Sequence, residues 1–127
     1  MTLPQMSLAV VGIDYPNRRG PGRRFELSLC SPGEPVELRR EPENPADPRA
    51  VAVFSARGIQ IGYLTAERCG RIGALIASGV EVRAIFQGIG PTAAWVRAAF
   101  HGESPDLPLP PPTDPASQSR EFWPDED

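Results

Sequence analysis

The stretch RREPENPADPRAVAVF, residues 39–54, joins a corner rich in proline and acid to a short apolar run. Asn44 and Asp47 each precede a proline, which biases their backbone away from the helical region, and their side chains can bond back to nearby backbone amides. Residues 50–54 form a continuous apolar run, as in a strand that is buried on both faces. The sequence therefore predicts a rigid turn that leads directly into a core strand.

Further short strands are predicted before and after this turn from apolar runs and from alternation of apolar and polar residues. Their ranges are 6–13, 35–40, 58–64, 80–86 and 93–100. One helix is expected between Thr65, which can cap its first turn, and Gly79, which can end its last turn. Between them, Cys69, Ile72 and Ile76 recur at helical spacing. Five or six strands with one helix predict a mainly β (α+β) fold, either a small OB-like curved sheet or a partly open β-barrel.

The C-terminal segment, residues 104–127, differs in composition from the rest of the chain. It carries 7 of the 16 prolines and has six acids against one arginine, net −5, whereas residues 1–103 have 12 arginines against 10 acids, net +2. Such a proline-rich, charged segment cannot bury enough surface to offset the cost of ordering. We therefore expect a domain at residues 5–103 followed by a disordered, Pro-rich acidic tail.

Several classes of protein are not expected. No apolar run approaches the roughly 20 residues of a membrane span, so we expect a cytoplasmic protein with no membrane partner. Cys30 and Cys69 lack metal-ligand spacing and are interpreted as core residues. His101 is the single histidine, and neither a nucleophile motif nor a phosphate-binding loop is found. We expect no enzyme, no catalytic residues, no cofactor and no metal.

Three stretches resemble the HIRAN domain family: VGIDY (11–15), GEPVELRREPENPADPRAVAVF (33–54) and GIQIGYLTAERCGRIGALIASG (58–79). The shared signature is an Arg-Glu/Asp-Pro-x-Asn-Pro-x-Asp-x-x-Ala-Val turn-strand, followed by an Ile-Gly-Tyr/His-Leu strand. The resemblance spans residues 7–87. It implies an OB-like fold that, in the replication-fork remodellers that carry this domain, grips single-stranded DNA at its 3′-hydroxyl end.

The resemblance also implies roles for four residues. Asp47 matches the acid that accepts the terminal hydroxyl, and Asn44 matches the turn asparagine beside it. Tyr15 matches an aromatic residue on which a base can stack, and Tyr63 occupies a position that the family fills with His or Tyr. Turn chemistry alone offers another interpretation, in which Asn44 and Asp47 only stabilise a tight turn.

Three positions depart from the pattern of the DNA-binding members. Ala46 stands where those members have an aromatic residue, Asp14 stands where they have a basic residue, and Pro16 stands in place of a second aromatic. Base stacking contributes about 1–3 kcal/mol per base, so the loss of two aromatic platforms weakens binding unless other contacts compensate. Binding of DNA ends is therefore a hypothesis for this chain.

Compensation is expected from the segment NRRGPGRR, residues 17–24, as a mobile basic rim that holds phosphates. Its four arginines are Arg18, Arg19, Arg23 and Arg24. An ordinary solvated loop is the alternative interpretation of this segment.

The leading hypothesis is a nucleic-acid-binding module that takes single-stranded DNA or a DNA 3′ end into a groove. The first predicted strand, the 42–48 corner and the 59–64 strand would form this groove, and the resemblance places such a module in DNA repair or replication. A second hypothesis is a protein-interaction adaptor, in which Phe122 and Trp123 of the tail dock into a basic, apolar groove on a partner. A third is an RNA-binding module, because aromatic stacking and arginine contacts do not distinguish the two sugars.

Overall fold

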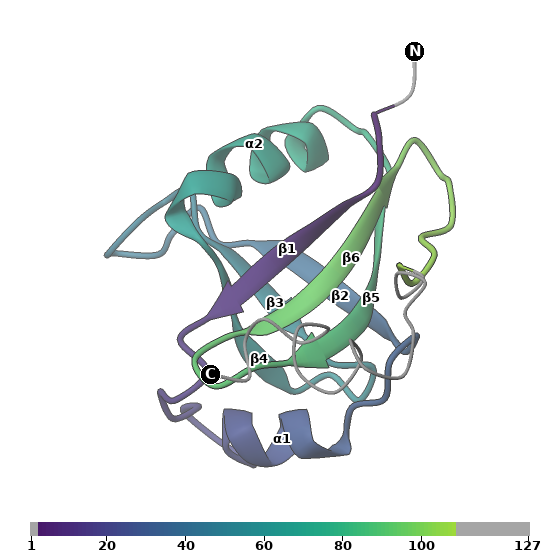
Figure 1. The fold of residues 1–127 in the computed structure, drawn as a ribbon. Helices are drawn as coiled ribbons and strands as arrows, with labels where there is room; N and C mark the ends of the chain where they lie inside the picture. Colours follow the sequence, from purple (N-terminus) through teal and green to yellow (C-terminus); the bar gives the residue numbers. More distant parts are fainter. Residues whose placement is uncertain (1–2, 109–127) are drawn as a thin grey trace, which may run out of the picture.

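Six strands and two helices build the part of the chain that the structure, a computed structural model, describes, which is residues 3–108 (Figure 1). The strands are β1 (Met6–Val11), β2 (Pro35–Arg40), β3 (Val51–Phe54), β4 (Gln60–Leu64), β5 (Val82–Ile89) and β6 (Ala94–Phe100), and the helices are α1 (Arg23–Leu29) and α2 (Ala66–Ala77). Neighbouring strands are all antiparallel, in the order β1-β4-β3-β2-β5-β6, and β6 pairs back to β1. The sheet therefore closes into a barrel.

The barrel interior is filled by side chains that alternate along the strands. Val96 and Phe100 of β6 share one parity and are fully buried, as the two-residue period of a strand requires. The strand β3 differs, because residues 51–53 are all buried. The helix α2 packs against it, with Gly73 beside Val51. The continuous apolar run at the end of the proline corner is thus a core strand, as predicted.

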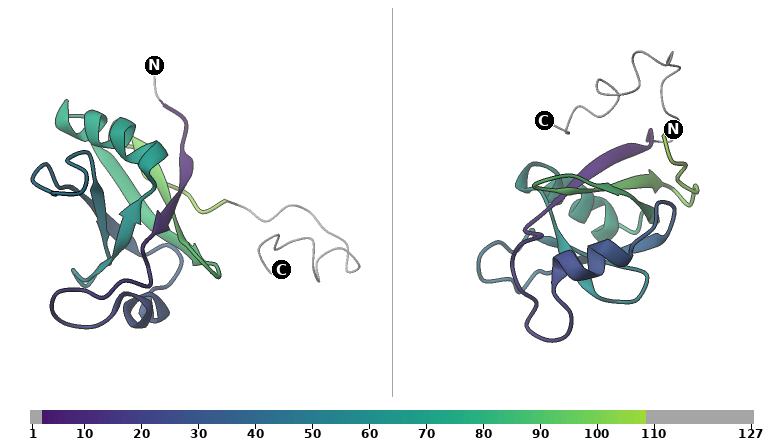
Figure 2. Two further views of the ribbon diagram at one scale, coloured as in Figure 1. Left: turned by 90° about the vertical axis from the view of Figure 1, so that its left-hand side faces the viewer. Right: turned by 60° about the horizontal axis from the view of Figure 1, so that its bottom comes forward.

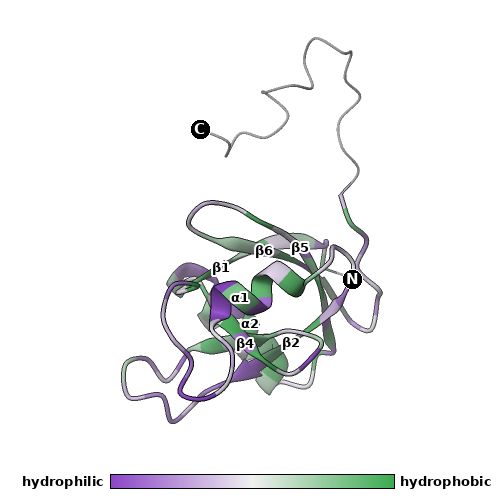
Figure 3. Ribbon diagram, turned by 90° about the horizontal axis from the view of Figure 1, so that it is seen from below, coloured by the Kyte–Doolittle hydropathy of each residue, from purple (hydrophilic) through white to green (hydrophobic). Residues whose placement is uncertain are grey.

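The two helices cover opposite ends of the barrel, as two further views show (Figure 2). Cys69 and Ile72 of α2 are buried in the core at one end, and Leu27 of α1 is buried at the other. Seen from below, α1 lies across the end of the barrel (Figure 3). Both open ends of the barrel are therefore covered by helix.

An ion pair between the buried Glu26 and the partly exposed Arg57 attaches α1 to the hairpin between β3 and β4. Glu26 is only 2% exposed, and its Oε2 accepts hydrogen bonds from Ser55 Oγ at 2.7 Å and from Arg57 Nε at 2.6 Å. Arg57 also reaches Glu34 at 3.5 Å. Removing Arg57 would be costly, because the Glu26 carboxylate would remain buried without a cation. These contacts hold α1 in place although its N-cap, Gly22, makes no side-chain capping bond.

The β1–β4 contact explains the glycine in the Ile-Gly-Tyr-Leu strand. Val10 pairs with Leu64, and Val11 pairs with Tyr63. A Cβ atom on Gly62 would lie 2.7 Å from Val10 Cγ1 and closer still to the Val11 carbonyl oxygen. Only glycine allows the two strands to approach this closely, so Gly62 is needed for β4 to pair with β1 and close the barrel.

The predicted fold class, a mainly β OB-like barrel, is confirmed, with two differences. The barrel is closed rather than partly open, because β6 pairs with β1 over residues 6–10. The helix α1 was not predicted, since its seven residues are too few for a periodic apolar pattern. Its first two residues belong to the segment 17–24 that was predicted to be a loop.

Only residues 104–108 of the predicted tail, 104–127, lie within the described part of the chain. Ser104 and Asp106 lie beside Gln5, whose side chain donates to the Ser104 carbonyl and accepts from the Asp106 amide. Residues 109–127, which include Phe122 and Trp123, lie outside the described residues. The boundary between domain and tail remains a prediction. In the described part of the chain, no helix is long and apolar enough to cross a membrane.

Candidate binding cleft

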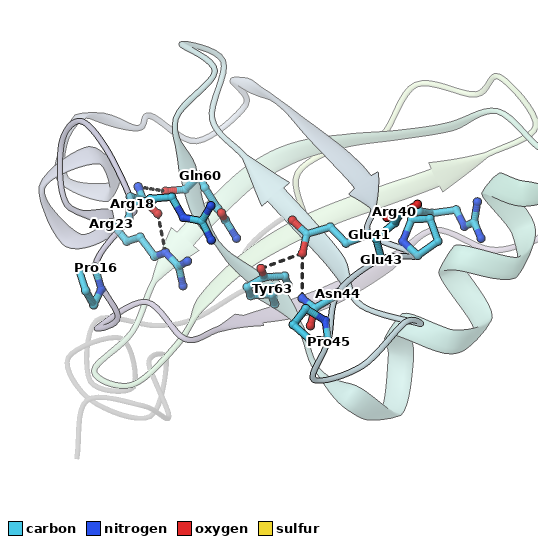
Figure 4. A pocket seen from close by; sticks show the side chains of 12 residues that line it. Pro16, Arg18, Arg23, Arg40, Glu41, Glu43, Asn44, Pro45, Gln60 and Tyr63 are labelled. Carbon is cyan, nitrogen blue, oxygen red and sulfur yellow. Dashed lines mark hydrogen bonds between the residues drawn. The ribbon is translucent and has the colours of Figure 1, made fainter.

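A cleft of about 780 Å³ opens on the side of the barrel (Figure 4). The loop after β1 and the turn after β2 both project on this side (Figure 2, left), and β4 lies between them. The lining residues are Pro16, Asn17, Arg18, Arg23, Arg40, Glu41, Pro42, Glu43, Asn44, Pro45, Gln60 and Tyr63. The structure therefore brings together two of the three segments from which the sequence predicts a groove, the 42–48 corner and the 59–64 strand. The remaining wall comes from the loop after the first predicted strand and not from that strand.

One wall of the cleft is a turn held by side-chain hydrogen bonds. Asn44 Oδ1 accepts the backbone N–H of Ala46 at 2.8 Å and that of Asp47 at 3.2 Å, as turn chemistry predicts. Asn44 Nδ2 donates to Glu41 Oε1 at 2.9 Å, and Tyr63 OH donates to the same oxygen at 2.9 Å. Asn44 and Tyr63 are thus both tied to one carboxylate, as Figure 4 shows.

Glu41 is the functional candidate that the sequence analysis missed. It belongs to the turn-strand signature, directly before the first proline of the corner, and the signature was the only signal that could have singled it out. Its contact with Tyr63 joins residues 22 positions apart in the chain. Such a contact depends on how β2 and β4 are arranged in the barrel, so it cannot be read from local sequence.

Asp47 lies beside the cleft rather than in its lining. Its Oδ1 accepts the Arg49 backbone N–H at 2.9 Å and faces Arg49 Nε at 3.4 Å. It lines a smaller hollow of about 230 Å³, and Asn44 and Tyr63 line both spaces. Ala46, the departure from the aromatic pattern, also lines the smaller hollow. Asn44 and Tyr63 therefore form the partition between the cleft and the Asp47 hollow.

Arg23 belongs to the opposite wall and has a fixed position. It is 8% exposed, its Nε donates to Asn17 Oδ1 at 2.8 Å, and its Nη1 donates to the Gly12 carbonyl at 2.8 Å. Its guanidinium carbon lies 5.6 Å from the centre of the Tyr63 ring. The prediction that Arg23 forms part of a mobile rim is wrong, because these bonds hold the side chain against the body of the barrel.

The other three arginines of the segment 17–24 differ in their surroundings. Arg24 is paired with Asp14 and donates to the Pro91 carbonyl at 2.9 Å. The hydrogen bond from Arg24 lowers the pKa of the Asp14 carboxyl below its ordinary value. Arg18 lines the cleft, whereas Arg19 is exposed and lies outside the lining. Of the four predicted arginines, Arg18 and the fixed Arg23 are the two that face the cleft.

Tyr15 lies outside the lining and next to it. Its side chain is 69% exposed, and its backbone N–H donates to the Gly12 carbonyl at 3.2 Å. The next residue, Pro16, does line the cleft. The ring of Tyr15 is therefore available to a ligand that extends beyond the cleft, whereas Tyr63 is the aromatic residue inside it.

The cleft is lined by both positively and negatively charged side chains. Three arginines and two glutamates are among its lining residues, and in Figure 4 Arg40 points away toward α2. Arg18 and Arg23 occupy one wall, and Glu41 occupies the other. Within the described residues, no group of three or more His, Cys, Asp or Glu side chains could hold a metal ion. The arrangement suits an elongated ligand that has anionic groups on one side and hydrogen-bond donors on the other.

Comparisons with known proteins agree with this fold. The crystal structure of the HIRAN domain of human HLTF has a TM-score of 0.61 at 21% identity, over 78% of this chain and 76% of that chain. A crystal structure of a Lactobacillus plantarum protein has a TM-score of 0.59 at 19% identity, over 76% of this chain and 98% of that chain. The NMR structure of the HLTF HIRAN domain in its DNA-bound conformation has a TM-score of 0.54 at 21% identity, over 78% and 75%.

No curated protein matches this chain. The family model of the HIRAN domain matches residues 5–98, which include all six strands except the last residues of β6. This match covers more than half of the chain, and the chain therefore belongs to the HIRAN domain family.

Proposed function

We propose that this chain is a DNA-binding module that takes single-stranded DNA into the cleft between the arginine loop and the proline corner. The observation that carries this proposal is that the Tyr63 ring lies in one cleft with Arg18 and with Arg23, whose guanidinium lies over the ring. An aromatic face combined with a basic groove is the usual way in which proteins bind single strands, because every base has a face that can stack. The DNA-bound form of the related HLTF domain supports this choice of ligand.

The two arginines would bind the sugar-phosphate backbone. Arg18 is exposed and can move toward a phosphate, whereas Arg23 is held by Asn17 and Gly12. Among the described residues, Arg23 Nη2 has no hydrogen-bond partner, so it keeps donors for a phosphate oxygen. Charge-assisted bonds of this kind are about twice as strong as neutral ones.

The finer proposal is that the strand ends at Asp47, with a free 3′-hydroxyl. The hydroxyl would enter the smaller hollow, past the partition formed by Asn44 and Tyr63. Both contacts of Asp47 with Arg49 use Oδ1, and Oδ2 has no partner among residues 3–108. An ionised carboxylate accepts a hydrogen bond from a hydroxyl and repels a terminal phosphate.

Fluorescence anisotropy tests both the binding of single-stranded DNA and the preference for a free 3′-hydroxyl. The probes are matched DNA oligonucleotides that end in a 3′-hydroxyl, in a 3′-phosphate, or in a hairpin that hides the end, at about 50 and 200 mM salt. We expect binding that weakens with salt and that is tightest for the free hydroxyl. An RNA strand of the same sequence is included, and tighter binding to it would change the proposed ligand from DNA to RNA.

The variant Asp47→Asn tests the finer proposal, because an amide oxygen can still accept the Arg49 backbone N–H. We expect the preference for 3′-hydroxyl over 3′-phosphate to fall by roughly tenfold, since a repulsive charge is removed. An equal loss of affinity for all three ends would contradict the role of Asp47 as the end reader. Failure of the unmodified protein to bind any oligonucleotide would contradict DNA binding itself and would favour the adaptor hypothesis. Deletion of residues 104–127 tests that hypothesis, which expects a co-purifying partner to be lost.

A further inference from the structure

Glu41 places a negative charge inside a cleft that is proposed to bind a polyanion. The residue is half-buried and lies on the wall opposite Arg18 and Arg23. Its Oε1 accepts hydrogen bonds from Tyr63 and from Asn44. Both donors are neutral, so neither of them compensates the carboxylate charge.

The second oxygen of Glu41 is open to a ligand. Among residues 3–108, Oε2 has no hydrogen-bond partner. In Figure 4 this oxygen points away from Asn44, toward the part of the cleft where Arg18 and Gln60 lie. A carboxylate oxygen with free lone pairs in this position accepts hydrogen bonds and cannot donate them.

A carboxylate in this place selects which part of a nucleotide can approach it. The phosphate is repelled and is attracted to the opposite wall, where the arginines lie. In single strands the Watson–Crick edges of the bases are free and can be read by side chains. The base beside Tyr63 is therefore the part of the ligand that can offer N–H donors to Glu41.

The four bases differ in what they offer to an acceptor. Guanine has two adjacent donors, N1–H and the 2-amino group, with no acceptor between them. The amino groups of adenine and cytosine stand next to a ring nitrogen that is itself an acceptor, and the single N3–H of thymine stands between two carbonyl oxygens. A carboxylate is repelled by each of these neighbouring acceptors, so guanine suits it best.

We propose that Glu41 is a specificity-determining residue, which makes the cleft prefer guanine at the nucleotide that stacks on Tyr63. This inference rests on the proposed binding of single-stranded DNA. It adds a base preference to a site whose other contacts, the Tyr63 ring and the arginines, accept any sequence. Within the turn wall, Glu41 would both position Tyr63 and read the base.

The test measures a ratio of affinities rather than a single affinity. The probes are ten-nucleotide thymine oligonucleotides with a free 3′-hydroxyl, in which one of the last three positions carries guanine, adenine, cytosine or hypoxanthine in place of thymine. We expect guanine at one position to bind about fivefold tighter than thymine, the low end for a contact to a base edge, because only Oε2 of Glu41 is open to the base. Hypoxanthine keeps N1–H and loses the amino group, so its affinity should fall between the two.

Glu41→Gln removes the charge while keeping an oxygen that can accept from Tyr63 and Asn44. We expect the affinity for every oligonucleotide to rise, because a repulsive charge is lost, and the guanine-to-thymine ratio to fall toward one. Glu43→Gln is the matched control, since it removes an equal charge from the exposed part of the same turn. This control should raise the affinities similarly and keep the ratio of the unmodified protein.

The possible results separate this inference from the proposed function. Equal affinity for guanine, adenine, cytosine, hypoxanthine and thymine at each of the three positions would overturn the base preference and leave DNA binding intact. A parallel loss of affinity for all oligonucleotides in Glu41→Gln, with the ratio unchanged, would mean that Glu41 only supports the turn. Failure of the unmodified protein to bind any oligonucleotide would overturn both proposals.

Discussion

Two glutamates of this barrel each accept two hydrogen bonds with one carboxylate oxygen, yet their surroundings differ. Glu26 is buried beneath α1, and its Oε2 accepts from the hydroxyl of Ser55 and from the guanidinium of Arg57. Glu41 is half-buried in the cleft, and its Oε1 accepts from the hydroxyl of Tyr63 and from a neutral amide. One charge is therefore compensated inside the structure, and the other is not.

The difference separates an acid that stabilises the fold from an acid that is available for recognition. A buried carboxylate needs a cation and hydrogen bonds to balance the cost of leaving water, and Glu26 has both. A half-exposed carboxylate keeps part of its hydration and tolerates neutral partners. The position of a carboxylate relative to solvent and to the nearest cation thus predicts whether its substitution will affect stability or binding.

The largest effect on stability is expected for Glu26→Gln. The substitution removes the charge that pairs with the partly exposed Arg57 and weakens the bond to the buried Ser55, so we expect the free energy of unfolding to fall by about 1–2 kcal/mol. Urea denaturation measures this change. Glu41→Gln is the matched variant and should cost less than about 1 kcal/mol, because its partners are neutral and partly solvated. Equal losses of unfolding free energy in the two variants would contradict the division into a stabilising and a recognition carboxylate.

Tyr63 should have the largest effect on DNA affinity, because its ring is the aromatic surface inside the cleft. In Tyr63→Ala the loss of base stacking should weaken binding by about 1–3 kcal/mol, which is roughly 5- to 150-fold in Kd. Tyr63→Phe keeps the ring and loses the bond to Glu41, so its affinity should change by only a few fold. Anisotropy titrations compare the two variants, and similar losses would show that the hydroxyl rather than the ring matters.

At temperatures where Glu26→Gln is fully folded, it should bind the same oligonucleotides as the unmodified protein does, since Glu26 lies beneath α1 and outside the cleft lining. Weaker binding by this folded variant would show that the ion pair beneath α1 influences the cleft.

Among the variants expected to change binding, the arginine variants should have the smallest effect, which is on the salt dependence of DNA affinity. Arg18 lines the cleft, so Arg18→Ala should reduce the slope of log K against log salt by about 0.7, the value for one phosphate contact to a single strand. Arg24 is engaged by Asp14 and by the Pro91 carbonyl, so Arg24→Ala should change the slope less. Titrations at four salt concentrations measure both slopes. A larger change for Arg24→Ala would mean that the ligand displaces Asp14.

Much of the barrel could be predicted because its signals are local. The prolines after Asn44 and Asp47 restrict the backbone on either side of the corner, and residues 51–53 are apolar on both faces of one strand. The helix α2 has both a periodic apolar stripe and a glycine after its end, so it too could be identified. In each case the preference depends on residues only a few positions away.

The sequence by itself determined the rigid corner, the core strand behind it and the membership of Asn44 and Tyr63 in one motif. Tertiary structure alone decided that the barrel closes, that Arg23 is held against Gly12, and that Glu41 joins the two motif residues through one oxygen. The physical reason is distance along the chain. Turn and strand preferences act between neighbours, whereas the burial and pairing of charged side chains depend on which distant segments the closed sheet brings together.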